Sequence, residues 1–155
     1  MPVVDDPYEF GRIAATNALS DVYAVGGRPV LALAIVGMPI DKITTETFKQ
    51  VLAGGAAVCK AAGVPIAGGH SIDTLEPIYG LAAIGMVDIT NIKRNIGAKP
   101  GDALILGKGL GTGFLASAAK SGTITDAGYK ELIATATLLN DIGADLGERE
   151  DVHAM

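Results

Sequence analysis

The sequence predicts an α/β fold in which helices and strands form layers, because amphipathic helical segments alternate with continuous apolar runs. Apolar residues make up 49% of the 155 residues and charged residues only 19%, so the chain can bury a sizeable core. A polar stretch from Thr90 to Gly101 interrupts the alternation. We therefore expect two unequal parts, an α/β domain over 1–95 and the start of a second α/β domain over 96–155.

The first helix is predicted to begin at Asp6-Pro7, since Asp suits the N-cap and Pro the first turn, and to end at Gly26-Gly27. An advance of about 100° per residue places a set of polar side chains on one arc of this helix. That set is Glu9, Arg12, Thr16, Ser20 and Tyr23.

The other helices and strands are predicted from hydrophobic periodicity and from glycine or proline residues at their boundaries. The unbroken apolar run Pro29–Val36 predicts a strand that is covered on both faces. The remaining predicted strands are Val64–Ala67, Ile78–Val87 and Ala103–Leu106, and the remaining predicted helices are Thr44–Ala62, Phe114–Lys120 and Asp126–Leu146.

Composition excludes several classes of protein. Twelve Lys and Arg against 17 Asp and Glu give a net charge of −5, which disfavours nucleic-acid binding. One cysteine cannot form an internal disulfide, and we expect a cytoplasmic protein. Neither a signal peptide nor an apolar stretch of membrane-spanning length is apparent, so we expect no membrane association.

Asp21 is the most informative single residue. It is predicted to lie with Asn17 on the apolar arc of the first helix that also carries Phe10 and Ala14. A carboxylate there is costly unless it is paired, hydrogen-bonded or bound to a cation. Two interpretations remain open: a structural Asp paired with backbone amides or with Arg28, or a Mg²⁺ ligand that Asn17 orients.

Two glycine-rich segments and the cysteine can each be interpreted as structural or as functional. Gly68-Gly69-His70-Ser71 follows a predicted strand and is either a tight turn or a loop whose amides approach a phosphate or base. The Gly107–Gly113 loop lacks the named phosphate-binding motifs and favours a close strand-to-helix turn. Cys59 lies on an apolar helical stripe and is expected to be a core thiol.

Four motifs together closely resemble the selenophosphate synthetase (selenide, water dikinase) family. They are MPVVDDPYEFGRIAATNALSDVYAVGG at 1–27, AGGHSID at 67–73, EPIYGL at 76–81 and GKGLGTG at 107–113, and the resemblance extends over essentially the whole chain. It implies a two-domain fold like that of aminoimidazole ribonucleotide synthetase. It also implies formation of selenophosphate, AMP and phosphate from ATP, selenide and water.

The resemblance assigns roles to four residues. Asp21 matches the family's Mg²⁺- and ATP-binding aspartate, and Gly69, His70 and Ser71 match its ATP-binding loop. It further implies a homodimer with ATP and selenide as substrates and Mg²⁺ as the metal ion.

Part of the family pattern has no counterpart in this sequence. Family members are about twice as long, and no residue here matches their catalytic Cys or selenocysteine, its Lys, or two further aspartates. The chain is therefore expected to be an internal piece, truncated at both ends and inactive alone. The alternatives are another ATP-dependent member of the aminoimidazole ribonucleotide synthetase superfamily, and a non-catalytic nucleotide-binding or dimerisation module.

Overall fold

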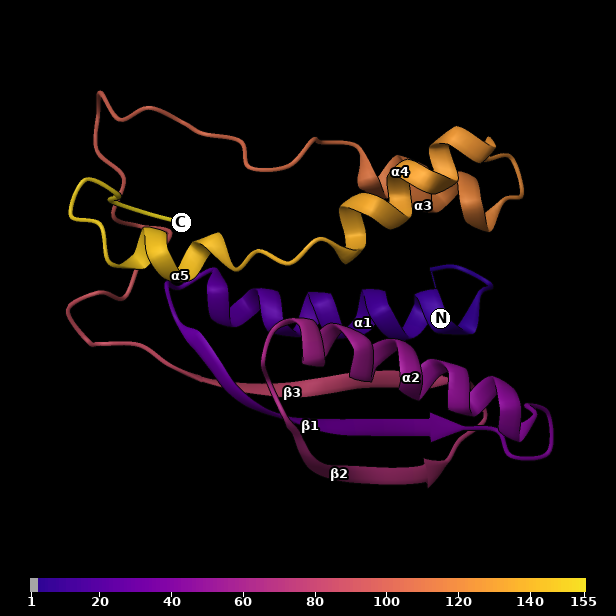
Figure 1. Ribbon diagram of the computed structural model, residues 1–155. Coiled ribbons are helices and arrows are strands. Elements are labelled where there is room, and N and C mark those ends of the chain that lie inside the picture. The colour runs from indigo at the N-terminus through magenta and orange to yellow at the C-terminus, as the bar shows by residue number, and fades with distance from the viewer. Residues whose placement is uncertain (1–2) are drawn as a thin grey trace.

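The computed structural model describes residues 3–155 and contains three layers (Figure 1). A sheet forms one outer layer, and α1 (Pro7–Tyr23) and α2 (Thr45–Ala61) cover one of its faces. The helices α3 (Thr112–Lys120), α4 (Asp126–Thr137) and α5 (Ile142–Gly147) lie on the other side of α1. The α/β prediction is confirmed.

The sheet has the order β2-β1-β3, with β1 (Arg28–Met38) in the centre. The strand β2 (Ile66–Asp73) pairs with it in parallel, and β3 (Ile78–Met86) pairs antiparallel. The predicted strands Pro29–Val36 and Ile78–Val87 thus lie in one sheet, beneath helices that begin near Pro7 and Thr44 as expected.

Local sequence explains where the first two helices begin. The side chain of Asp6 accepts a hydrogen bond from the Glu9 amide at 2.9 Å, and Pro7 occupies the first turn. Thr44 caps α2 in the same way, by accepting from the Thr47 amide at 3.2 Å. Both caps satisfy amides that would otherwise have no partner within the helix.

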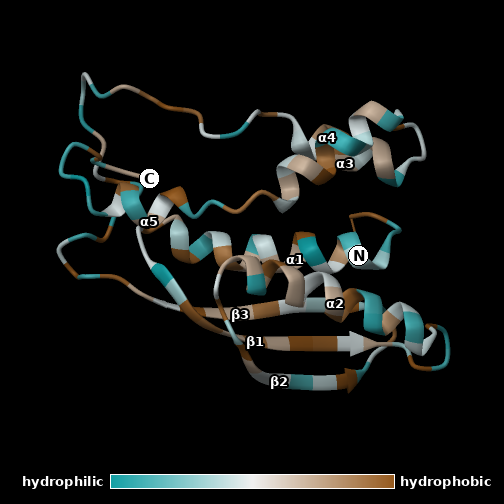
Figure 2. Cartoon of the chain, viewed as in Figure 1, coloured by the Kyte–Doolittle hydropathy of each residue, from teal (hydrophilic) through white to brown (hydrophobic). Residues whose placement is uncertain are grey.

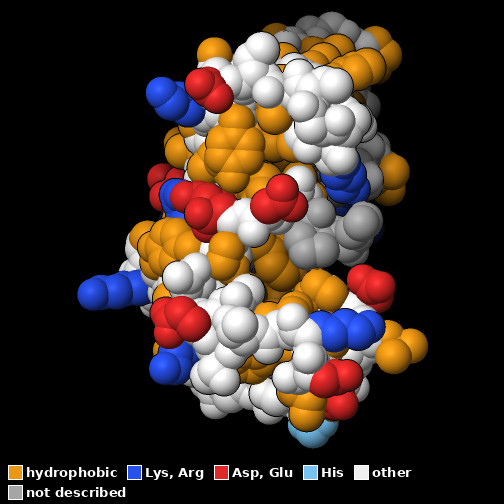
Figure 3. Space-filling model, turned by 90° about the vertical axis from the view of Figure 1, so that its right-hand side faces the viewer, with side chains coloured by type: hydrophobic (Ala, Val, Ile, Leu, Met, Phe, Trp, Pro, Cys, Tyr) orange, Lys and Arg blue, Asp and Glu red, His pale blue; other side chains and the backbone are white. Residues whose placement is uncertain are grey.

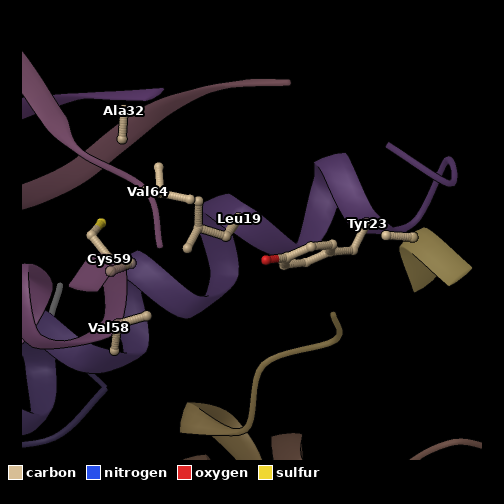
Figure 4. Close-up of a cluster of buried hydrophobic side chains, with 8 residues drawn as sticks. Leu19, Tyr23, Ala32, Val58, Cys59 and Val64 are labelled. Atoms are coloured by element: carbon tan, nitrogen blue, oxygen red, sulfur yellow. The ribbon is translucent and has the colours of Figure 1, made fainter. Parts of the chain in front are cut away.

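The core lies between α1, α2 and the inner face of the sheet. Its main cluster includes Leu19 and Tyr23 of α1, Val58 and Cys59 of α2, and Ala32 of β1 (Figure 4). The helices α1 and α2 approach closely, because a Cβ at Gly11 would clash with the carbonyl of Val51 and one at Gly54 with that of Tyr8.

Polar contacts and the buried Ala144 of α5 join the third layer to α1. Arg12 donates to Thr137 Oγ1 at 3.0 Å, and Asn140 donates from Nδ2 to Ser20 Oγ at 2.6 Å. The predicted polar arc of the first helix therefore faces protein rather than solvent, and its members Thr16 and Tyr23 are buried. The helices α4 and α5 cover this arc.

Three predictions about individual segments were wrong. Residues 103–106 form no strand, and Leu104 is 95% exposed, because no neighbouring strand pairs with this segment in the described chain. The long helix predicted for Asp126–Leu146 is divided into α4 and α5, since Leu138 is extended and Asp141 caps a new helix. Residues 68–71 belong to β2 rather than to a loop.

The two-sided cover predicted for the central strand is also absent within the described residues. Leu33 and Ile35 on its outer face are 36% and 46% exposed, whereas Ala32 and Val36 on the inner face are buried. Figure 2 shows that β1 and β3 are nevertheless largely apolar, whereas β2 also has hydrophilic and neutral segments. Within residues 3–155, no helix is both long and apolar enough to cross a bilayer.

Candidate functional site

Asp21 lies in the last turn of α1 and is exposed. The predicted buried position was wrong because the buried ridge of α1 runs through Gly11, Ala15 and Leu19. Asn17 and Asp21 each lie two residues from Leu19, which places them about 160° around the helix from it.

The proposed structural role of Asp21 also lacks support. Arg28, its suggested partner, instead forms ion pairs with Asp145 at 2.9 Å and Glu148 at 3.0 Å. No hydrogen bond or ion pair to the Asp21 carboxylate occurs within the described residues. The carboxylate is therefore exposed and available to a cation or to another ligand.

Gly69, His70 and Ser71 lie in the middle of β2, opposite Ala34, Ile35 and Val36 of β1. A register shift between Ala32 and Leu33 bends the pairing just before them. Gly69 has φ of 152°, and a Cβ there would clash with the Ala34 backbone, so this position requires glycine. All residues of β2 are exposed, and its outer edge has no neighbouring strand in the described chain.

The structure does not bring Asp21 together with the β2 residues in one chain. The helix α1 packs mainly on α2 and β3, whereas β2 lies beyond β1 at the opposite edge of the sheet (Figure 1). Within residues 3–155, no group of three His, Cys, Asp or Glu side chains is arranged to hold a metal ion. Asp21 would thus supply only part of a metal's coordination shell.

The Cys59 thiol and the Tyr79 hydroxyl are buried, so neither can react directly with a ligand at the molecular surface. Cys59 is 1% exposed, and burial raises the pKa of its thiol, so it is the expected core residue. Tyr79 is 7% exposed, and its hydroxyl packs against Gly55 and has no hydrogen-bond partner among the described residues. Burial raises the pKa of Tyr79 to about 12, with a smaller contribution from Cys59.

Sequence reasoning missed a polar cleft between α1 and the third layer. The cleft has a volume of about 260 Å³ and is lined by residues that include Thr16, Asn17, Lys108, Thr112 and Asn140. The glycine spacing of 107–113 pointed to this loop, but its position against α1 depends on tertiary packing that no local pattern encodes.

The outer face of the sheet is a broad apolar surface. Its exposed side chains include Leu33 and Ile35 of β1, Ile72 of β2, and Ile78, Ile84 and Met86 of β3. The side of the molecule in Figure 3 differs from this face, because charged residues of both signs alternate with apolar ones there. Contiguous apolar surface of this kind is typical of a protein–protein interface.

The fold and sequence identify the family. The AIR synthase related protein family, N-terminal domain, matches residues 1–87, so the chain belongs to this family. Among curated proteins, the chain is 59% identical over all 155 residues to a selenide, water dikinase of Rhizobium meliloti (strain 1021). It is 56% identical over 155 residues to a selenide, water dikinase of Pseudomonas straminea.

The chain spans less than half of these relatives, 44% of the first and 43% of the second. Solved structures agree on the fold. The thiamine monophosphate kinase of Aquifex aeolicus superposes with a TM-score of 0.80 at 18% identity, covering 94% of this chain and 51% of that one. A complex of hydrogenase maturation protein HypE with ATP gives a TM-score of 0.54 over 59% of this chain and 29% of that one, at 19% identity.

Proposed function

We propose that this chain is the ATP-binding portion of a selenide, water dikinase, which makes selenophosphate, AMP and phosphate from ATP, selenide and water. The observation that carries the proposal is the identity of 56–59% to proteins of that name, which extends over all 155 residues of the chain. The likeness to thiamine monophosphate kinase, at 18% identity, concerns the fold alone.

In this proposal, Asp21 contributes a carboxylate oxygen to Mg²⁺ bound with ATP. Its chemistry fits, because Mg²⁺ prefers hard oxygen ligands and usually takes one or two carboxylates together with substrate phosphates. The side chain is exposed and has no partner among the described residues, so binding requires no existing contact to break. When bound, the ion neutralises phosphate charge during phosphoryl transfer.

Gly69, His70 and Ser71 are proposed as the second nucleotide contact. Gly69 lets β2 lie close against Ala34 of β1, while His70 and Ser71 offer side-chain hydrogen-bonding groups on an exposed strand. Since β2 and the end of α1 are separated in one chain, we propose that one nucleotide touches Asp21 of one copy and β2 of a second copy.

A homodimer through the outer sheet face fits this arrangement. That face carries exposed Leu33, Ile35 and Ile84, and a second copy would cover it with an identical apolar surface. We also propose that 1–95 and 96–155 belong to separate domains of a longer cytoplasmic enzyme. No helix or strand occurs between Met86 and Thr112, which agrees with a connector in this region.

The test uses a chimera in which this chain replaces the matching 155 residues of the Rhizobium meliloti protein. Calorimetry would measure ATP affinity with and without Mg²⁺ for the chimera, for Asp21→Asn and for Asp41→Asn, a matched exposed control in a loop. We expect Asp21→Asn alone to weaken Mg²⁺-dependent ATP binding by about tenfold or more, with unchanged thermal stability. Equal affinities in the two variants would contradict the assigned role.

A further inference from the structure

The cleft between α1 and the glycine-rich loop has a composition suited to an anion. Besides Ile13 and Ala136, it is lined by hydroxyl, amide and ammonium groups. None of its lining residues in the described chain is acidic. Its volume of about 260 Å³ is several times the roughly 30 Å³ that one water molecule occupies in the liquid.

Lys108 supplies a positive charge that is only partly compensated. Its Nζ donates to the carbonyl oxygen of Thr135 at 3.2 Å and to that of Leu138, near the C-terminal end of α4. An ammonium group has three N–H donors, so one remains for a ligand. Burial lowers the pKa of Lys108, and a bound anion would offset this destabilisation of its charged form.

The start of α3 provides further donors. Gly111 occupies its N-cap with φ of 105°, and no side chain caps the first amides of this helix in the described chain. Thr112, the first residue of α3, lines the cleft. Unpaired amides and the positive end of the helix dipole both favour an anion at such a position.

Thr16 is an independent indication of a missing ligand. It is 3% exposed and lines the cleft, yet its Oγ1 has no hydrogen-bond partner in the described chain. A buried hydroxyl without a partner is unfavourable, so native proteins rarely retain one without a reason. A ligand oxygen in the cleft would remove this cost.

We propose that this cleft binds a phosphate group, held by Lys108, Thr16 and the amides at the start of α3. Neither Asp21 nor Gly69–Ser71 lines this cleft, which contains residues from both the first helix and the second part of the chain. Its ligand is either inorganic phosphate or the phosphate of a nucleotide, which share the same tetrahedral oxyanion.

The test is an NMR titration of the 155-residue chain with inorganic phosphate and, separately, with ATP in the absence of Mg²⁺, at constant ionic strength. We expect saturable shifts of the Gly109, Gly111, Thr112 and Gly113 amides. Lys108→Met should weaken binding about tenfold or more. Lys120→Met, which removes the same charge at the other end of α3, should not.

Thr16→Val distinguishes ligand binding from a structural role, and it also decides the test if Lys108→Met does not fold. Valine keeps the shape and removes the unpartnered hydroxyl, so the melting temperature should stay equal or rise while phosphate affinity falls several-fold. Saturation by inorganic phosphate would identify a free-phosphate site, and saturation by ATP alone a nucleotide site. No saturable shifts with either probe, or equal affinities in all variants, would overturn the proposal.

Discussion

The outer sheet face offers the clearest quantitative test of the dimer proposal. Ile35 lies at its centre, paired across the sheet with His70 of β2 and Gly80 of β3, and is 46% exposed. Full burial of an Ile side chain stabilises by about 1.5–3 kcal/mol, so covering the remaining 46% contributes about 0.7–1.4 kcal/mol per copy. A two-fold dimer buries two such side chains, or about 1.4–2.8 kcal/mol in total.

Ile35→Ala should therefore weaken dimerisation about tenfold, the lower end of that range because alanine retains Cβ. Ile35→Asp should abolish the dimer at micromolar concentration, since it would bury an unpaired charge. Sedimentation velocity over a concentration series measures both effects. Ile40→Ala is the control, because Ile40 is 73% exposed but lies beyond β1. A dimer unaffected by Ile35→Asp would refute the assignment of this face.

Further predictions concern stability and reactivity. Tyr79→Phe removes a buried hydroxyl without a partner, so the free energy of unfolding in urea should be unchanged or up to about 1 kcal/mol higher, and a clear loss would reveal a hidden hydrogen bond. Cys59 should resist a thiol reagent at pH 8 until the chain unfolds, because its thiol is buried and its pKa is raised. Rapid modification would mean that α2 opens readily. Amides of residues 103–106 should exchange with solvent much faster than those of residues 30–36, since only the latter lie in a hydrogen-bonded strand. Equal protection of the two segments would indicate a strand that pairs with residues 103–106.

Much of the first part of the fold could be predicted because its signals are local. Asp6 is the N-cap that the sequence predicts, and the apolar runs at 29–36 and 78–87 form neighbouring strands. It was harder to predict which face of each helix or strand is buried. Helical periodicity places Thr16 on a polar arc, but the third layer buries it.

The structure of residues 96–155 was less predictable, because it depends on which neighbouring segments each stretch of chain contacts. Residues 103–106 have a strand composition, yet a strand forms only where a neighbour completes its hydrogen bonds. The position of Asp21 in the candidate site likewise depends on tertiary packing. Its residue type and spacing pointed to a cation ligand, whereas its exposure and its distance from β2 in the fold depend on how α1 packs.

The most direct test of the central claim is the activity of the chimera built on the Rhizobium meliloti protein. Phosphorus NMR would follow ATP in the presence of Mg²⁺, with and without selenide. We predict that the chimera forms AMP, phosphate and selenophosphate only when selenide is present, and that the 155-residue chain alone forms none of them. A folded chimera that binds ATP but shows no selenide-dependent AMP would contradict the proposed function.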